Sequence, residues 1–203
     1  MPESPADPPP SLPIFGGAPR ERADAARNRL AVLAAAERLF ALHGVQHVSM
    51  DAIAAEAGVG KGTLFRRFGD RAGLARALLD RDDRALQEAA IRGPAPLGPG
   101  ASPRARLKAF GAASFALLET HAELMTDAEG VGWLKSDASA FRRLHVLVLI
   151  AEADPAADAE MLADVLLVPL APFLFRFWRE VAGMSLARVT AGFEDLVDRV
   201  LPP

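Results

Sequence analysis

Residues 49–68 read SMDAIAAEAGVGKGTLFRRF, and this stretch decides the fold. Its apolar residues fall into two short segments of helical spacing on either side of Gly58. Glycine supplies the backbone freedom that a sharp turn between two helices needs. Leu64 and Phe68 lie one helical turn apart, so both are expected to point into a core. The pattern predicts a helix-turn-helix, with its second helix over residues 61–68.

The second helix presents a face suited to the major groove of DNA. At about 100° per residue, Gly62, Thr63 and Arg66 lie opposite the two inward residues. Glycine at position 62 lets the backbone approach DNA closely, and the exposed first turn of a helix attracts phosphate. Double-stranded DNA is therefore the expected partner. The candidate contact residues are Ser49, Lys61, Gly62, Thr63, Phe65, Arg66, Arg67 and Arg71.

Several of these residues also have a purely structural interpretation. Ser49 is a good helix N-cap and needs no other role. Arg67 and Arg71 are alternatively ordinary solvated charges, because basic side chains are common on exposed helix faces. Phe65 lies on the flank of its helix and is alternatively a core residue. The sequence leaves both interpretations open for all four.

Helical spacing continues along nearly all of the chain, and no segment alternates long enough to predict a strand. The expected fold is all-α, with a helix-turn-helix head over residues 21–70 and a helical body over residues 71–203. Residues 1–20 are rich in proline and are expected to form a disordered arm. Helices are expected at about 25–43, 71–90, 103–123 and 138–153, then from Asp154-Pro155 with bends at Pro169 and Pro172, and finally after Ser185.

Composition narrows the class of protein further. The 203 residues carry a net charge of −3 and include no cysteine, which excludes disulfides and thiolate chemistry. Residues 20–85 carry 12 basic against 9 acidic residues, so a mildly basic head belongs to an acidic chain. The longest apolar run is shorter than the ~20 residues that span a bilayer, and the N-terminus lacks a signal-peptide pattern. We therefore expect a cytoplasmic protein with no membrane partner.

The head resembles the N-terminal domain of the TetR (tetracycline-repressor-like) family over contiguous residues with the spacing intact. The resemblance implies a dimeric transcriptional regulator that binds a short palindromic operator and releases it when a small effector binds. The rest of the chain resembles the family in helical layout and length. The residues that carry the resemblance are Arg29, Val32, Leu33, Ala35, Ala36, Leu39, Phe40, Gly44, Ser49, Ile53, Ala54, Ala57, Gly58, Val59, Gly62, Thr63, Leu64, Phe65, Phe68, Arg71 and Leu74.

The last helix carries a narrow apolar seam with alternating steps of three and four residues, as in a coiled coil. The resemblance implies that the last two helices of each subunit form a four-helix dimer interface, so we expect a homodimer. The alternative is a stripe that faces the core of the chain itself. The seam residues are Leu186, Val189, Phe193, Leu196 and Val200.

Aromatic and histidine residues concentrate in the body, where the resemblance implies a small-molecule site. We expect a small, mostly apolar or aromatic effector, oriented by His121 or His145. An ordinary core is the alternative, because it has the same composition. The histidines lack metal-ligand spacing, so neither a metal nor another cofactor is expected. The candidate pocket residues are Phe110, His121, Trp133, Phe141, His145, Phe173, Phe177 and Trp178.

Two other classes of function remain as alternatives. The first is an all-helical enzyme, although the sequence contains no nucleophile elbow, P-loop, dinucleotide fingerprint or metal-binding motif. The second is a ligand-carrying or protein-docking module whose DNA-binding head has decayed. The retained Lys61, Thr63, Arg67 and Arg71 argue against such decay.

Overall fold

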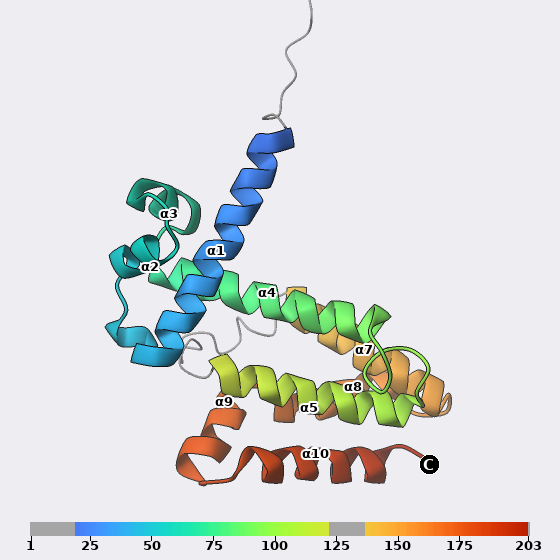
Figure 1. The fold of residues 1–203 in the computed structure, drawn as a ribbon. Coiled ribbons are helices and arrows are strands. Elements are labelled where there is room, and N and C mark those ends of the chain that lie inside the picture. Colours follow the sequence, from blue (N-terminus) through green and yellow to red (C-terminus); the bar gives the residue numbers. More distant parts are fainter. Residues whose placement is uncertain (1–18, 122–136, 203) are drawn as a thin grey trace, which may run out of the picture.

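The computed structural model describes residues 19–121 and 137–202, and these residues form an all-α fold, as predicted (Figure 1). Helix α4 (Arg71–Arg92) leads from the head into the body. The head comprises α1 (Pro19–His43), the 3-10 turn η1 (Val45–His47), α2 (Met50–Glu56) and α3 (Lys61–Phe68). The body comprises α5 (Pro103–His121), α7 (Asp137–Ala153), α8 (Ala159–Leu167), η3 (Val168–Leu170), α9 (Pro172–Arg176), the π-helical turn η4 (Phe177–Val181) and α10 (Leu186–Val200).

The body is organised around α5, which contacts α4, α7 and α10. Helix α8 packs against α7 and contributes Ala163, Leu166 and Leu167 to the body core. Figure 1 shows α4 on one side of α5 and α10 on the opposite side, with the head at the far end of α4. Helix α4 therefore links the head to the body.

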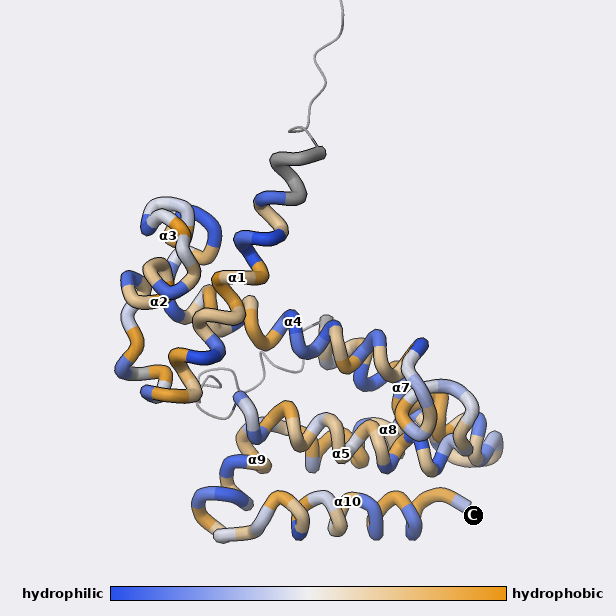
Figure 2. The backbone as a smooth tube through the Cα atoms, in the orientation of Figure 1, coloured by the Kyte–Doolittle hydropathy of each residue, from blue (hydrophilic) through white to orange (hydrophobic). Residues whose placement is uncertain are grey.

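Two apolar cores result, and α4 contributes to both. The head core joins α1, α2 and α3 to Leu74, Ala77 and Leu78 of α4, while Leu86 and Ala90 enter the body core. The head core thus extends past residue 70, the predicted boundary, because the first turns of α4 cover the head. Figure 2 shows the hydrophilic stretch of α4 that separates the two apolar regions.

Several helices begin or end at the capping residues that the sequence predicts. Ser49, Asp70 and Ser185 each accept a hydrogen bond from the backbone N–H three residues on, at 3.1, 2.8 and 3.2 Å. Gly44 has a φ of 75°, which favours glycine, and its N–H donates to the carbonyl of Phe40 at 2.8 Å. These local contacts satisfy backbone groups that a helix terminus would otherwise leave unpaired.

The predicted helix boundaries were wrong at two places. Helix α1 begins at Pro19 rather than near residue 25, because proline is tolerated in the first turn of a helix. The remainder of the predicted arm lies outside the described residues. Asp154 does not start a helix, since its carboxylate accepts a hydrogen bond from the N–H of Ala156 in a turn. Asp158 instead caps α8, by accepting from the N–H of Met161 at 3.1 Å.

Pro169 and Pro172 interrupt the apolar segment more sharply than the predicted bend. Helix α8 ends at Leu167, and the segments Ala159–Leu170 and Pro172–Val181 meet at 43°. Among the described helices, none by itself has the length and apolarity to cross a membrane, whereas this bent pair meets both criteria by length and composition.

Candidate nucleic-acid interface and effector pockets

Helices α2 and α3 meet in the turn that the sequence predicts. Gly58 has a φ of 66°, and its N–H donates to the carbonyl of Ala55 at 3.2 Å. The N–H of Val59 donates to the carbonyl of Ala54 at 3.0 Å and closes the turn. Leu64 is 1 % exposed, so one face of α3 is fixed against the head core. The opposite face of α3 must therefore point to solvent.

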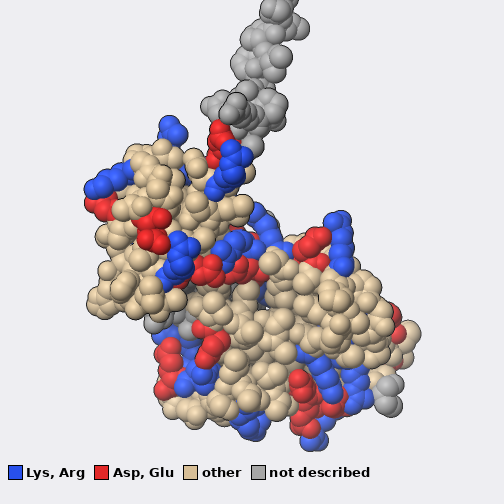
Figure 3. Space-filling model, in the orientation of Figure 1, with Lys and Arg blue, Asp and Glu red and all other residues tan. Residues whose placement is uncertain are grey.

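The outward face of α3 is open. Lys61, Gly62, Thr63 and Arg66 are exposed, and no atom of the part of the chain that the structure describes lies within 4 Å of the position that a Cβ on Gly62 would take. Phe65 is 46 % exposed, which excludes the core role left open by the sequence. Figure 3 shows Lys and Arg side chains projecting from this end of the head, with acidic side chains beside them. Positive charge, a hydroxyl, an aromatic ring and an open backbone together fit the major groove.

Two of the predicted DNA contacts also hold the head together. The Nη1 of Arg67 donates to the carbonyl of Ala25 at 2.8 Å and joins α3 to α1. The Nη1 of Arg71 donates to the carbonyl of Val45 at 3.1 Å. Neither arginine is simply a solvated charge, so substitutions at these positions affect the fold as well as any phosphate contact.

Further contacts that the sequence did not reveal position α3. Lys61 pairs with Asp51 of α2, which restrains the side chain at the start of α3. The guanidinium of Arg29 lies 5.5 Å from the ring centroid of Phe68, within the range of a cation–π contact. Both pairs join residues that are distant in sequence, and the helical pattern within one segment does not indicate such pairs.

The seam predicted on α10 is divided between core and surface. Val189 and Phe193 are buried against α5 of the same chain, so both side chains pack into the body core, which is the alternative that the sequence left open. The Phe193 ring meets Phe115 edge-on at 5.7 Å, and its Cε1 lies 2.1 Å from where a Cβ on Gly111 would stand. The absence of a Cβ at Gly111 therefore makes room for Phe193 within the chain. The remaining seam residues are half-buried: Leu186, Leu196 and Val200.

Three predicted pocket residues, Phe110, Phe141 and His145, form an aromatic cluster between α5 and α7. The centroids of the Phe110 and His145 rings lie 4.8 Å apart, and Phe141 stacks on His145 at 5.6 Å. The Nε2 of His145 is buried, and none of the described residues gives it a hydrogen-bond partner. Burial, followed by the charge of Arg106, lowers the pKa of His145 from 6.5 to about 4. His145 is therefore neutral near pH 7.

Other predicted pocket residues lie elsewhere. Phe173 and Phe177 are 65 % and 50 % exposed, so neither side chain lies inside the body core. Trp178 lines a groove of about 290 Å³ against α10. Trp133 lies outside the described residues.

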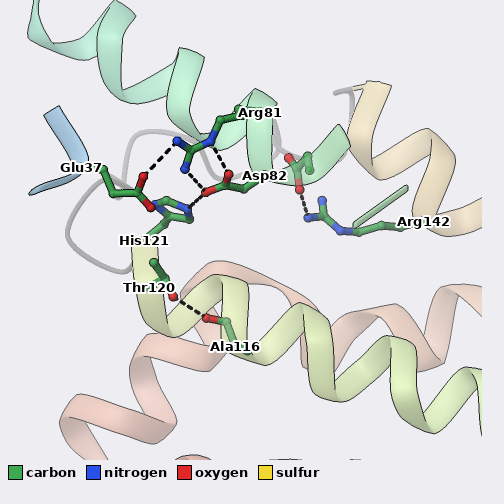
Figure 4. Close-up of polar contacts among 8 residues, drawn as sticks. Glu37, Arg81, Asp82, Ala116, Thr120, His121 and Arg142 are labelled. Carbon is green, nitrogen blue, oxygen red and sulfur yellow. Dashed lines mark hydrogen bonds and ion pairs between the residues drawn. The ribbon is translucent and has the colours of Figure 1, made fainter. Parts of the chain in front are cut away.

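Charged residues of α4 tie the head to the body (Figure 4). Arg81 Nη1 donates to Glu37 Oε2 of α1 at 2.9 Å, and Asp82 Oδ2 lies 2.7 Å from Nε2 of His121 on α5. Burial opposes ionisation of Asp82, but hydrogen bonds from Arg81 and His121 prevail and lower the pKa of Asp82. A groove of about 530 Å³ includes Glu37 and His121 among its walls. The predicted pocket residue His121 thus belongs to the joint between the two domains.

The next residue of α4, Asp83, pairs with Arg142 of α7 (Figure 4). Arg142 is 6 % exposed, so the ion pair is largely withdrawn from water. Burial raises the pKa of Asp83, although the charge of Arg142 opposes the rise. Both side chains line a pocket of about 330 Å³ between α4 and α7, together with Phe141. The sequence did not indicate this pair, because its members are 59 residues apart.

Sequence comparison finds relatives of the head. Residues 32–78 match the family model described as bacterial regulatory proteins, tetR family. An HTH-type transcriptional regulator of Staphylococcus aureus (strain USA300) is 43 % identical over 61 residues, which cover 30 % of this chain and 33 % of that protein. The chain therefore matches about a third of the length of this curated relative.

Solved structures match most of the chain. A TetR-family transcriptional regulator of Pectobacterium atrosepticum has a TM-score of 0.63 and 25 % identity, covering 90 % of this chain and 98 % of its own. SmeT in its complex with triclosan has a TM-score of 0.59 and 20 % identity, and the match covers 87 % of this chain and 95 % of SmeT.

The fold and the open face of α3 define a helix-turn-helix protein with a helical body. The head of the chain, over residues 32–78, matches the tetR family of bacterial regulatory proteins, and the described residues share the fold of TetR-family regulators of known structure. The resemblance found in the sequence is confirmed.

Proposed function

We propose that this chain is a transcriptional repressor that binds a palindromic DNA operator in the cytoplasm, where bacterial DNA lies. The observation that carries the proposal is α3, whose Lys61, Gly62, Thr63 and Arg66 are exposed while Leu64 is buried. A helix held in this way enters the major groove, and a two-fold dimer reads two half-sites. Occupation of an operator that overlaps a promoter excludes the polymerase.

A second copy of the chain is the proposed protein partner, at the exposed face of α8 and α9. Met161, Val165 and Val168 follow one face of helical spacing and are 61, 47 and 52 % exposed. Phe173 and Phe177 continue the exposed apolar surface on the next segment. Large apolar side chains exposed in this number mark an interaction surface. The proposed interface therefore lies beside the α10 seam rather than on its buried residues.

The proposed effector is a small molecule with an apolar part, which binds in the body and releases DNA. SmeT, whose fold is similar, has been solved with triclosan, and this supports a small-molecule site in such a body. A ligand changes DNA affinity when it binds one arrangement of the heads better than another. Helix α4 enters both cores, so it provides the connection between the two sites.

A mobility-shift experiment on the DNA upstream of the chain's own gene tests the proposal. We expect a shift that survives excess random DNA and maps to an inverted repeat. The double variant Lys61→Ala/Arg66→Ala should abolish this shift, because both exposed cations leave the face of α3. Arg199→Ala is the matched control, since Arg199 is an exposed cation on α10 that pairs with Asp195.

Absence of a sequence-specific shift would contradict the proposal and favour a ligand-carrying module. An equal shift by the double variant would also contradict it, since the contact surface would then lie elsewhere. Sedimentation of the same samples gives the oligomeric state, for which we expect a dimer.

A further inference from the structure

The residues that line the pocket between α4 and α7 favour one chemical class of ligand. It measures about 330 Å³, and Leu86, Ala138 and Phe141 provide its apolar wall. Its buried charge is Arg142, which pairs with Asp83. We propose that this pocket binds a small carboxylate with an apolar body, and that the ligand replaces Asp83 as the partner of Arg142.

The two members of the buried pair differ in what happens when they lose their partner. A guanidinium stays charged at every accessible pH, so Arg142 needs an anion beside it. Asp83 can instead take up a proton and become neutral. A ligand anion can therefore displace Asp83 from Arg142. A ligand cation that captured Asp83 would take from the buried Arg142 the carboxylate that pairs with it, which is unfavourable.

The surroundings of Asp83 act on its pKa in both directions, and the net effect is a raised pKa. Burial raises the pKa of Asp83, and the neighbouring Asp80 on α4 acts in the same direction. Arg142 from α7 and His121 from α5 act against the rise. Once Arg142 turns to a ligand, its opposing effect is removed and protonation of Asp83 becomes easier. Uptake of one carboxylate with one proton leaves the net charge of the pocket unchanged.

The wall of the pocket accounts for the apolar part of the ligand. Phe141 packs on His145 with an angle of 17° between the rings, so the aromatic wall is supported from within the body. Arg84 and Gln87 also line the pocket and supply further hydrogen-bond donors. A volume of about 330 Å³ lies at the small end of ligand pockets, which favours a ligand with one ring or a short chain.

Binding at this place has a direct route to the head. The contact between Asp83 and Arg142 holds α4 to α7, and the first turns of α4 belong to the head core. Exchange of the partner of Arg142 removes one of the contacts that hold α4 to α7. The regulatory consequence rests on the proposed function, whereas carboxylate binding itself does not.

Calorimetry with simple probes tests the exchange on the full-length protein. Benzoate and hexanoate are the carboxylates, and benzamide and benzylamine are the neutral and cationic controls. We expect the carboxylates to bind and the controls to fail. Titrations in two buffers of different ionisation enthalpy should show uptake of about one proton, with affinity falling about tenfold per pH unit above neutrality. Failure of both carboxylates, or binding without proton uptake, would overturn the proposal.

Variants at Asp83 and Arg142 test the contribution of each charge separately. Asp83→Asn keeps the shape of the side chain but removes its charge, so benzoate should bind roughly tenfold more tightly and without proton uptake. If this variant unfolds, benzoate should restore it on refolding. Arg142→Met should not bind benzoate. Arg143→Gln is the control for α7, because Arg143 pairs with Asp164 of α8 and does not line the pocket.

Unchanged benzoate binding by Arg142→Met would reject the site. Operator affinity measured without any carboxylate reports separately on the proposed function. A protein that binds benzoate but no DNA would keep this inference and reject the regulator, and the converse result would do the opposite.

Discussion

Arg81 of α4 donates a hydrogen bond to Glu37 of α1 at 2.9 Å, and its guanidinium also contacts Asp82 at 2.6 Å. Between Leu78, which belongs to the head core, and Leu86, which belongs to the body core, α4 contributes no fully buried apolar side chain. Figure 3 shows acidic and basic side chains gathered where the head meets the body. Partly solvated ion pairs of this kind are individually weak, so this joint is suited to reversible movement.

Arg81→Gln should loosen the head without unfolding the protein. The side chain is partly exposed, so we expect the free energy of unfolding to fall by about 1 kcal/mol or less. Operator affinity should fall several-fold, because two unrestrained heads lose more freedom on binding. Fluorescence anisotropy with full operator and single half-site DNA checks this, with Arg92→Gln as a control from the exposed end of α4. Equal losses on both DNAs would show that Arg81 acts in some other way.

Arg66→Ala and Arg67→Ala should have different effects. Arg66 is exposed on the open face of α3, so its loss should alter sequence preference more than affinity for random DNA. Arg67 donates to the carbonyl of Ala25, so its loss should also lower the free energy of unfolding by about 1 kcal/mol. Arg67→Ala should weaken binding to all sequences and reduce the salt slope by about one. If Arg66→Ala lowers the affinity for all DNA sequences equally, Arg66 does not contribute to base recognition.

Gly62→Ala should stabilise the protein and impair DNA binding. The added methyl group meets no atom of the described residues within 4 Å, and alanine is favoured over glycine in a helix by up to about 1 kcal/mol. On DNA the same methyl group would stand where the helix approaches the groove. Thermal unfolding and operator binding should therefore move in opposite directions. An increase in both the unfolding temperature and the operator affinity would show that α3 does not approach DNA at Gly62.

His145→Phe should remove a dependence of stability on pH. The pKa of His145 is about 4 in the folded chain and 6.5 ordinarily, so the unfolded chain binds more protons between these values. Stability that is present above pH 6.5 should therefore be lost as the pH falls towards 4. The phenyl ring keeps the contacts with Phe110 and Phe141 and removes an unpaired buried nitrogen, which adds about 1–3 kcal/mol. Urea unfolding at pH 5 and 7.5 checks this, and an unchanged pH slope in the variant would contradict it.

Phe193→Asp and Val165→Asp should separate the core from the proposed dimer interface. Phe193 is 3 % exposed against α5, so an aspartate there should unfold the body. Val165 is 47 % exposed, so an aspartate there should leave a folded monomer with weak operator binding. Circular dichroism reports folding, and sedimentation reports association. A folded Phe193→Asp monomer, or a normal Val165→Asp dimer, would indicate that the dimer interface lies on α10.

The head was predictable because its signals are local. Helix α3 begins and ends at the predicted residues, and the caps Ser49 and Asp70 act where expected, since each depends on positions three or four residues apart. The inward Leu64 and outward Arg66 follow from helical periodicity in the same way. The body was less predictable, because Asp154 and Asp158 both have a residue type suited to capping and their local turn decides between them.

The sequence by itself determined the all-α fold, the helix-turn-helix and the exposed face of α3, because helix periodicity and capping are short-range effects. Tertiary structure alone decided which face of α10 is buried, since Phe193 needs the space beside Gly111 on another helix. It also decided that Asp83 meets Arg142 across 59 positions and that Arg81 meets Glu37 across 44. A charged residue carries no local sign of its distant partner, because packing of the helices brings the two together.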